Sequence, residues 1–325
     1  MSDPYPEAGP PIRVPRRSAH LETLRPYDLL AVALASTVGA LLAVPAPDST
    51  TGLSRVLLAT VTGTAGCVST LYAADYLTRH DDVIGKPHRP IPSGRLTEAA
   101  AKRSALLAGV VTVAVTCAVN RLALIFLAVA VLAQYAYGHR GKDHGLWGDL
   151  LNGVSGWSCT VLAGACFTAR WPPSDVWPVA VVLGLQGTFS NLLLALGDLD
   201  ADRAAGRRTH PVRHGHARTV ATLALVATAG YTLAAVCLAT RHTAPATYAP
   251  AAVALVLAAI CLVLVAPRTP GVAARLSRAT EVHFYERLVL PGALLAPATG
   301  TPPALAVTCA AVGLLALSPR ALLPH

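Results

Sequence analysis

Two short stretches of this sequence place several carboxylates just before several cationic side chains. The first is "DYLTRHDDVIGKPHRPIPSGR" (75–95) and the second is "LGDLDADRAAGRRTHPVR" (196–213). In each stretch the acids are followed by a Gly, a basic residue, a His and a Pro. The two stretches form a weak internal repeat, and membrane proteins commonly use duplicated halves to place equivalent loops around one site.

The spacing of the acids predicts a shared face on a helix. Asp198 and Asp202 are four residues apart, whereas Asp200 between them points away, and Asp75 and Asp82 are seven apart. Carboxylates gathered in this way repel unless cations compensate them. Mg²⁺ takes oxygen ligands and bridges one or two carboxylates to phosphate groups, and Lys and Arg neutralise further phosphate charge. The pattern therefore predicts a Mg²⁺-dependent diphosphate-binding site.

Helices must position these groups, and the composition indicates that the helices lie in a membrane. The chain has 325 residues, of which 54% are hydrophobic and 13% charged, whereas soluble domains carry about a quarter charged residues. We expect an all-α polytopic membrane protein, with about nine transmembrane helices around a central cavity. The expected spans are 24–45, 54–77, 99–119, 121–138, 148–169, 176–197, 216–240, 247–267 and one within 285–319.

The two ends of the chain need separate treatment. The last span contains "APATGTPPA" (296–304), so we expect Pro297, Pro302 and Pro303 to break it. Residues 1–22 are Pro-rich and basic and lack the apolar core of a signal peptide. We expect a disordered cytoplasmic tail over 1–22 and one transmembrane domain over 23–321.

The basic residues predict one orientation. If the N-terminus is cytoplasmic, all but five of the 26 Lys and Arg residues fall on the cytoplasmic side, which follows the positive-inside rule. Arg287 is among the residues counted in cytoplasmic segments. Both acidic clusters then face the cytoplasm of a multi-pass cell-membrane protein. The net charge of +9 is explained without a nucleic-acid partner. A pair of acid clusters at helix ends can also simply meet water and headgroups, but two matching clusters on one side disfavour that interpretation.

These residues resemble the UbiA superfamily of intramembrane prenyltransferases. "DVIGKPHRPIPSGRL" (82–96) resembles the family's segment K-P-x-R-P-I-P-S-G, which follows NDxxDxxxD, and "GDLDADRAAGRRT" (197–209) resembles its DxxxDxxxG segment. "YGHRGKDHGLWGD" (137–149) is similar to a third loop of the family, and Arg25 matches an Arg at the start of the family's first helix. The resemblance spans almost the whole chain.

The resemblance implies an enzyme that transfers an isoprenyl group from a prenyl diphosphate to a lipophilic, aromatic acceptor. By this resemblance the Mg²⁺ ligands are Asp82, Asp198 and Asp202, with Asp75 and Asp81 as additional candidates. It also implies a catalytic role for Lys142 beside these aspartates. The implied diphosphate-binding residues are Arg25, Lys86, Arg89, Tyr137, Lys142, Arg207 and Arg208. The isoprenyl tail would lie in a dry chamber that protects an allylic cation from water.

The sequence departs from the first motif of the family. The family's Asn falls on Ala74 and its middle Asp on Thr78, so the first Mg²⁺ site is depleted, while Asp149 replaces an Asn of the third loop. Three functions stay open: prenyl transfer, cyclisation of a prenyl diphosphate by a membrane terpene cyclase of the same superfamily, and binding or transport of a lipid without chemistry. The retained basic loops favour continued diphosphate binding.

Polar residues inside the apolar spans have two interpretations. Asn191 shares a helix face with Asp198 and either lines the chamber or bonds a neighbouring helix. Glu281, His283 and Glu286 precede an apolar run, where they either supply a base or cap the last helix.

Overall fold

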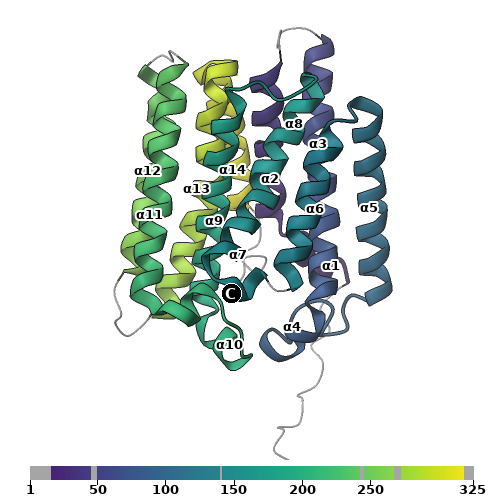
Figure 1. The fold of residues 1–325 in the computed structure, drawn as a ribbon, viewed down its shortest axis with the longest axis vertical. Coiled ribbons are helices and arrows are strands. Elements are labelled where there is room, and N and C mark those ends of the chain that lie inside the picture. The colour runs from purple at the N-terminus through teal and green to yellow at the C-terminus, as the bar shows by residue number, and fades with distance from the viewer. Residues whose placement is uncertain (1–15, 45–49, 140, 242–244, 267–271, 318–325) are drawn as a thin grey trace, which may run out of the picture.

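The computed structural model describes residues 16–44, 50–139, 141–241, 245–266 and 272–317. Within these residues every regular element is a helix, so the all-α prediction is confirmed. Helices are what this sequence must form in a membrane, because a bilayer core offers no water to bond exposed backbone groups and the helix satisfies them internally. Figure 1 shows the long helices packed side by side into one bundle.

The helices have the following bounds: α1 (Arg16–Leu24), α2 (Pro26–Ala43), α3 (Thr50–Leu77), α4 (Arg79–Gly85), α5 (Glu98–Val119), α6 (Ala123–His139), η1 (Gly141–His144), α7 (Leu146–Gly153), η2 (Val154–Ser158), α8 (Cys159–Thr168), α9 (Val176–Gly197), α10 (Leu199–Ala204), α11 (His210–Thr240), η3 (Pro245–Thr247), α12 (Tyr248–Val265), α13 (Val272–Thr299) and α14 (Thr301–Leu317). The segment η2 is a turn of π-helix that joins α7 to α8.

Seven described segments are long and apolar enough to cross a membrane, and α6 and α14 are shorter apolar helices. The first eight expected spans each coincide with a helix or, in the case of α7 and α8, with a continuous helical segment. The start expected at residue 216 for the seventh span follows a kink at Gly215, whose φ of 76° interrupts α11. The count of about nine is therefore approximate, because the last expected span divides in two.

The break in the last span lies at Gly300. Helix α13 continues through Pro291 and Pro297, and Gly300 then adopts φ 81° before α14 begins. A positive φ is accessible to glycine at little cost. Pro302 and Pro303 lie in the first turn of α14, where their missing N–H groups cost nothing. The break is confirmed, but glycine makes the turn and two of the three prolines start the next helix.

The N-terminal segment differs in part from the expectation. Helix α1 covers residues 16–24 and so overlaps the end of the segment expected to be a disordered tail, and Ala19 is fully buried in a cluster with α3 and the loop before α5. Residues 1–15 lie outside the described residues.

Close packing of α2 on α8 forms the centre of the bundle. A Cβ atom built on Gly164 would lie 2.4 Å from the Ser36 carbonyl oxygen, so only glycine permits this approach. Thr168 Oγ1 donates to the Ala40 carbonyl across the same interface at 2.7 Å. Small residues that let backbones approach are the usual basis of helix packing in membranes. The main apolar core extends from here to α9 and α13.

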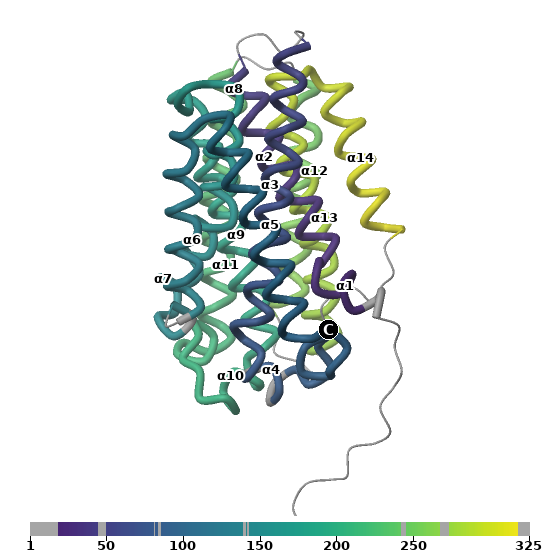
Figure 2. Tube along the Cα trace, turned by 90° about the vertical axis from the view of Figure 1, so that its right-hand side faces the viewer, coloured from purple at the N-terminus to yellow at the C-terminus, as the bar shows by residue number. Residues whose placement is uncertain are grey.

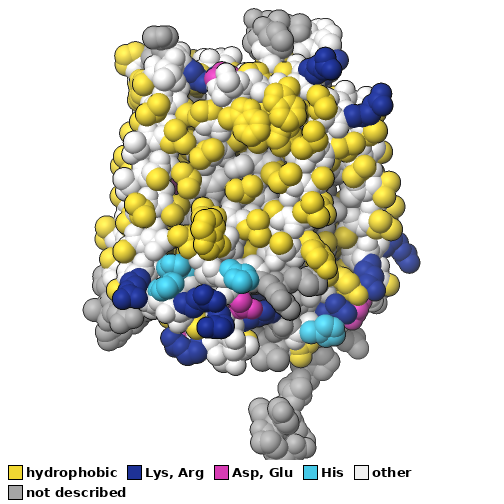
Figure 3. Space-filling model, viewed as in Figure 1, with side chains coloured by type: hydrophobic (Ala, Val, Ile, Leu, Met, Phe, Trp, Pro, Cys, Tyr) yellow, Lys and Arg dark blue, Asp and Glu magenta, His cyan; other side chains and the backbone are white. Residues whose placement is uncertain are grey.

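Both acidic stretches lie at one end of the bundle. Helices α4 and α10, which follow the two apolar spans, lie together at the lower end in Figure 1, and α14 lies on one side of the bundle in Figure 2. Hydrophobic side chains cover the middle of the molecule in Figure 3, whereas Lys, Arg and His gather toward that lower end. We call this end, defined by α4 and α10, the acidic end.

A candidate active site at the acidic end

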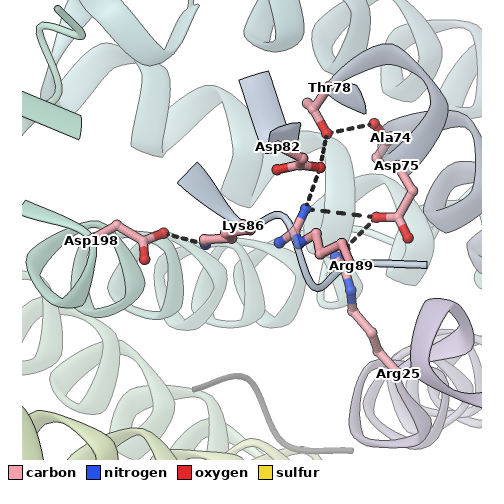
Figure 4. Close-up of polar contacts among 8 residues, drawn as sticks. All are labelled: Arg25, Ala74, Asp75, Thr78, Asp82, Lys86, Arg89 and Asp198. Atoms are coloured by element: carbon pink, nitrogen blue, oxygen red, sulfur yellow. Dashed lines mark hydrogen bonds and ion pairs between the residues drawn. The ribbon is translucent and has the colours of Figure 1, made fainter. Parts of the chain in front are cut away.

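The first acidic cluster consists of Asp75, Asp82 and the two arginines that contact them. Arg25 Nη2 lies 2.5 Å from Asp75 Oδ1. Arg89 Nη1 lies 2.9 Å from Asp82 Oδ2 and 3.9 Å from Asp75 Oδ1. Both carboxylates are buried, with side chains 5% and 11% exposed. Figure 4 shows Arg89 between the two carboxylates.

Arg25 reaches this cluster from a strained position. It precedes Pro26 at the start of α2 and is the one non-glycine residue with positive φ among the described residues, at φ 43°. Such backbone costs about 1 kcal/mol or more and concentrates at functional sites. Desolvation lowers the pKa of the Arg25 guanidinium, but the neighbouring acids, Asp75 foremost, more than offset this and hold its pKa above the usual range. Arg25 is thus a permanently charged partner of Asp75.

Lys86 joins the two acidic stretches. Its Nζ atom lies 2.7 Å from Asp198 Oδ2, across 112 residues of sequence. Lys86 caps the end of α4, and Asp198 lies between the end of α9 and the start of α10. In Figure 4 Lys86 points away from Arg89 toward Asp198. The predicted convergence of the two stretches is therefore present in the structure.

The second acidic cluster, Asp198 and Asp202, is more open than the first. The Asp198 side chain is 38% exposed, and Asp202 is half-buried one turn later on α10. Asp200 points away as its spacing predicts, with a side chain that is 93% exposed and paired with Arg203 at 3.0 Å. Among the described residues no three His, Cys, Asp or Glu side chains meet in a metal-binding group. A cation here would need oxygens from a ligand as well as from the protein.

The third loop contacts the second acidic stretch. Asp143 Oδ1 accepts from the Arg208 backbone N–H at 2.8 Å, and Asp143 Oδ2 lies 3.8 Å from Arg207 Nη1. Arg207 is half-buried and Arg208 is exposed. Lys142 lies beside Asp143 in η1. The side chains of Lys142 and Asp81 lie outside the part of the structure that is described, so their expected roles stay predictions.

Tyr137 belongs to a polar chain inside the bundle. Its hydroxyl donates to Asn191 Oδ1 at 3.0 Å, and Asn152 Nδ2 donates to the same oxygen at 3.1 Å. Asn191 Nδ2 donates to Asp149 Oδ1 at 2.5 Å. Asp149 is buried. The acid that replaces the family's Asn is thus held by Asn191, and Asn191 connects helices α6, α7 and α9.

Sequence reasoning missed an ion pair and misplaced a cluster in α13. Arg287 was expected in a loop, but it is a buried residue of α13, and its Nη2 lies 2.6 Å from Asp28 Oδ1. The capping interpretation of Glu281, His283 and Glu286 is wrong, since α13 begins at Val272 and all three lie in its interior. The sequence did contain a usable signal, namely charged residues next to an apolar run. A charge inside an apolar helix is costly and marks a functional or packing site.

Glu286 is the centre of that buried cluster. Its Oε1 accepts from Gln186 Nε2 at 2.9 Å and from the Tyr231 hydroxyl at 2.5 Å. His283 Nδ1 lies 3.0 Å from Glu286 Oε2. These side chains come from α9, α11 and α13, and three of them line a small hollow between these helices. These contacts satisfy the hydrogen-bonding capacity of a buried carboxylate between helices. The cluster is separate from the acidic end.

Comparison with known proteins settles the family. The model of the UbiA prenyltransferase family matches residues 31–285. The chain belongs to the UbiA prenyltransferase family. A digeranylgeranylglyceryl phosphate synthase of Methanopyrus kandleri is 30% identical over 218 residues, which cover 65% of this chain and 76% of the relative. This UbiA family member is thus similar to named prenyltransferases over most of its length.

Solved structures of UbiA homologues share its fold. The apo structure of a homologue from Aeropyrum pernix K1 has a TM-score of 0.70 at 15% identity and covers 83% of this chain and 97% of that chain. The structure of a homologue from Archaeoglobus fulgidus bound to GPP and Mg²⁺ has a TM-score of 0.62 at 15% identity. The match covers 84% of this chain and 99% of that chain. The UbiA fold therefore holds both acidic stretches of this chain at one end of the bundle.

Proposed function

We propose that this UbiA family member transfers an isoprenyl group from a prenyl diphosphate to a lipophilic acceptor within the membrane. The observation that carries the proposal is the 2.7 Å contact between Lys86 Nζ and Asp198 Oδ2. It brings a cation of the first stretch to a carboxylate of the second, at the end of the bundle where the third loop also arrives. A diphosphate needs this mixture of cations and metal-binding acids in one place.

The basic residues at the acidic end fall into two groups, one that binds diphosphate and one that pairs with buried carboxylates. Lys86, Arg207 and Arg208 supply half-buried or exposed cations for the diphosphate oxygens, since Arg and Lys bind phosphate through charge-assisted hydrogen bonds. Arg25 and Arg89 stay fixed on buried carboxylates. The apolar helices above the acidic end exclude water from the isoprenyl chain, which protects a reactive intermediate from hydrolysis.

The second acidic cluster fits Mg²⁺. Asp198 and Asp202 offer hard oxygen donors one turn apart, and Asp198 is open enough to exchange its ion pair for a metal ion. Mg²⁺ bound there would stabilise the negative charge that develops on the departing diphosphate. A homologue that binds GPP and Mg²⁺ with the same fold supports this assignment.

Mutations within the acidic stretch test the proposal. The full chain in lipid nanodiscs is incubated with geranyl, farnesyl or geranylgeranyl diphosphate, Mg²⁺ and acceptors, and released diphosphate is measured. Asp198→Asn and Asp202→Asn should each lower the rate at least about a hundredfold, as loss of a group that stabilises developing charge does. Asp200→Asn is the matched control, since Asp200 is exposed and points away. Unchanged release in both active-site variants would refute the proposed function.

The acceptor is proposed only as lipophilic, and two classes are compared. The family resemblance implies an aromatic acceptor, whereas the name of the Methanopyrus kandleri relative indicates a glyceryl phosphate that carries prenyl groups. Product masses with each acceptor decide between them. We also propose that the acidic end faces the cytoplasm, because Lys and Arg gather there. A cysteine-labelling assay in intact cells tests this orientation.

A second candidate is a membrane terpene cyclase, which Ala74 and Thr78 favour because they alter the first acidic motif. Incubation with each prenyl diphosphate and Mg²⁺, without any acceptor, distinguishes the two. A cyclase releases diphosphate together with a cyclised hydrocarbon or alcohol, whereas a transferase gives no such product until acceptor is added.

A further inference from the structure

The buried acids of the first acidic cluster already have cationic partners. Asp75 contacts Arg25 at 2.5 Å, and Asp82 contacts Arg89 at 2.9 Å. Arg89 Nη1 also lies 3.9 Å from Asp75, so one guanidinium lies between the two carboxylates. Among the side chains that the structure describes in this cluster, two acids face two arginines, so their charges balance.

Thr78 completes the cluster without adding a metal ligand. Its hydroxyl lies 2.9 Å from Asp82 Oδ2 and 3.0 Å from the Ala74 carbonyl, so it serves as a donor to oxygen. The family motif has an Asp where this chain has Thr78, and an Asn where this chain has Ala74. A carboxylate at position 78 would lie beside Asp82 and would add a negative charge that two arginines do not balance. Thr78 adds none and leaves the cluster closed.

A divalent cation at this cluster would be costly. It would have to displace Arg89 and Arg25 from carboxylates that are 11% and 5% exposed, and the displaced guanidinium groups would remain next to the metal ion. A buried charge that loses its partner is strongly destabilising. The second acidic cluster differs, since Asp198 is 38% exposed and its ion pair among the described residues is with Lys86, which is 26% exposed.

From this contrast we infer that the chain works with one divalent cation, held at Asp198 and Asp202, and that Arg89 occupies the position of a second. The inference rests on the proposed function. It assigns Arg89 as a positioning residue that fixes Asp75 and Asp82 and anchors the loop from which Lys86 reaches Asp198. The first cluster then holds its two carboxylates with guanidinium groups, which stay charged at any ordinary pH, in place of an exchangeable metal ion.

Metal stoichiometry tests the inference directly. The full chain in nanodiscs, with a non-reactive thiolodiphosphate analogue of the prenyl substrate, is titrated with Mn²⁺, and bound ions are counted by electron paramagnetic resonance. The wild type should bind one Mn²⁺ per chain. Asp198→Asn should weaken that binding at least about tenfold, whereas Asp82→Asn should leave the count at one. Two ions in the wild type, or loss of the ion in Asp82→Asn alone, would overturn the inference.

A gain-of-site variant avoids the risk that Asp82→Asn disturbs folding. Ala74→Asn/Thr78→Asp supplies the residues that the family motif has at these positions, and it should bind a second Mn²⁺ with a magnetic coupling to the first. A variant that still binds one ion would show that Thr78 is not what closes the first cluster and would overturn that assignment. An active wild type that binds two ions would refute this inference but not the proposed function. An inactive wild type that binds no ion would refute the proposed function itself.

Discussion

Asp28 and Arg287, which are 259 residues apart in the chain, form an ion pair inside the bundle with a 2.6 Å contact. The pair joins α2 to α13, and the guanidinium lies over the Trp157 ring, 4.7 Å from its centroid. Asp28 follows Arg25 by one helical turn, and Arg25 holds Asp75 of the first acidic cluster. The N-cap residue and the first turn of α2 thus form two ion pairs, one with the acidic end and one with the interior.

We expect Asp28→Asn to destabilise the protein, because it leaves the buried Arg287 guanidinium without a counter-charge. The loss should be about 2 to 3 kcal/mol, somewhat below the value for a fully buried pair, since the Asp28 side chain is 21% exposed. Thermal unfolding in detergent micelles measures the change. Asp200→Asn, which breaks the exposed pair with Arg203, is the control and should leave the melting temperature unchanged. Equal melting temperatures for the two variants would contradict the expected role of the buried pair.

Gly187→Ala should disturb the position of Trp157. A Cβ atom at Gly187 would lie 1.9 Å from Trp157 Cδ1, so the indole must shift from its present position. Overpacking of this kind costs about 1 to 3 kcal/mol. A lowered melting temperature together with a shifted tryptophan emission is the expected result. Gly197→Ala on the same helix is the control, because its Cβ would meet no heavy atom within 4 Å; a matching loss in that variant would show that the contact with Trp157 is not the cause.

The sequence predicted the spans and the acidic end well, for a physical reason. A membrane imposes one length and one secondary structure on each apolar segment, so hydropathy alone placed most helices. The i, i+4 spacing of Asp198 and Asp202 and the direction of the spans placed both acidic stretches at one end. The same spacing correctly predicted that Asp200 points away from the site.

Pairings between distant segments were beyond the sequence. The positive-inside rule treats each arginine as a loop residue, so it placed Arg287 outside the helix in which it is buried. The partner Asp28 lies at the other end of the chain, and only tertiary packing brings the two together. Asn191 shows the same limit, since its partners Tyr137 and Asp149 come from two other helices.

Glu286 should matter as a hydrogen-bond acceptor. Glu286→Gln keeps an oxygen that accepts from Tyr231 and Gln186 and should stay within about 1 kcal/mol of the wild type. Glu286→Leu has similar bulk but leaves both donors unsatisfied, so it should cost about 2 kcal/mol or more. Unfolding midpoints of the two variants measure the difference. If both variants lose stability to the same extent, the negative charge and its contact with His283 matter more than the accepted hydrogen bonds.

Lys86→Ala should weaken diphosphate binding without unfolding the protein. Lys86 is half-buried, and its ammonium contacts Asp198 at 2.7 Å, so its removal deletes the cation that links the two acidic stretches. A hydrogen bond to a charged group is worth about 1.5 to 3 kcal/mol, which corresponds to roughly a tenfold to hundredfold loss of affinity for the thiolodiphosphate analogue. Lys86→Arg keeps the charge and should recover part of the affinity. Lys102→Ala is the control: Lys102 lies on α5 over the Tyr76 ring, and its loss should leave the affinity unchanged. If Lys86→Ala and Lys102→Ala bind the analogue equally well, the contact between Lys86 and Asp198 is a packing feature of the bundle end and does not mark the diphosphate site.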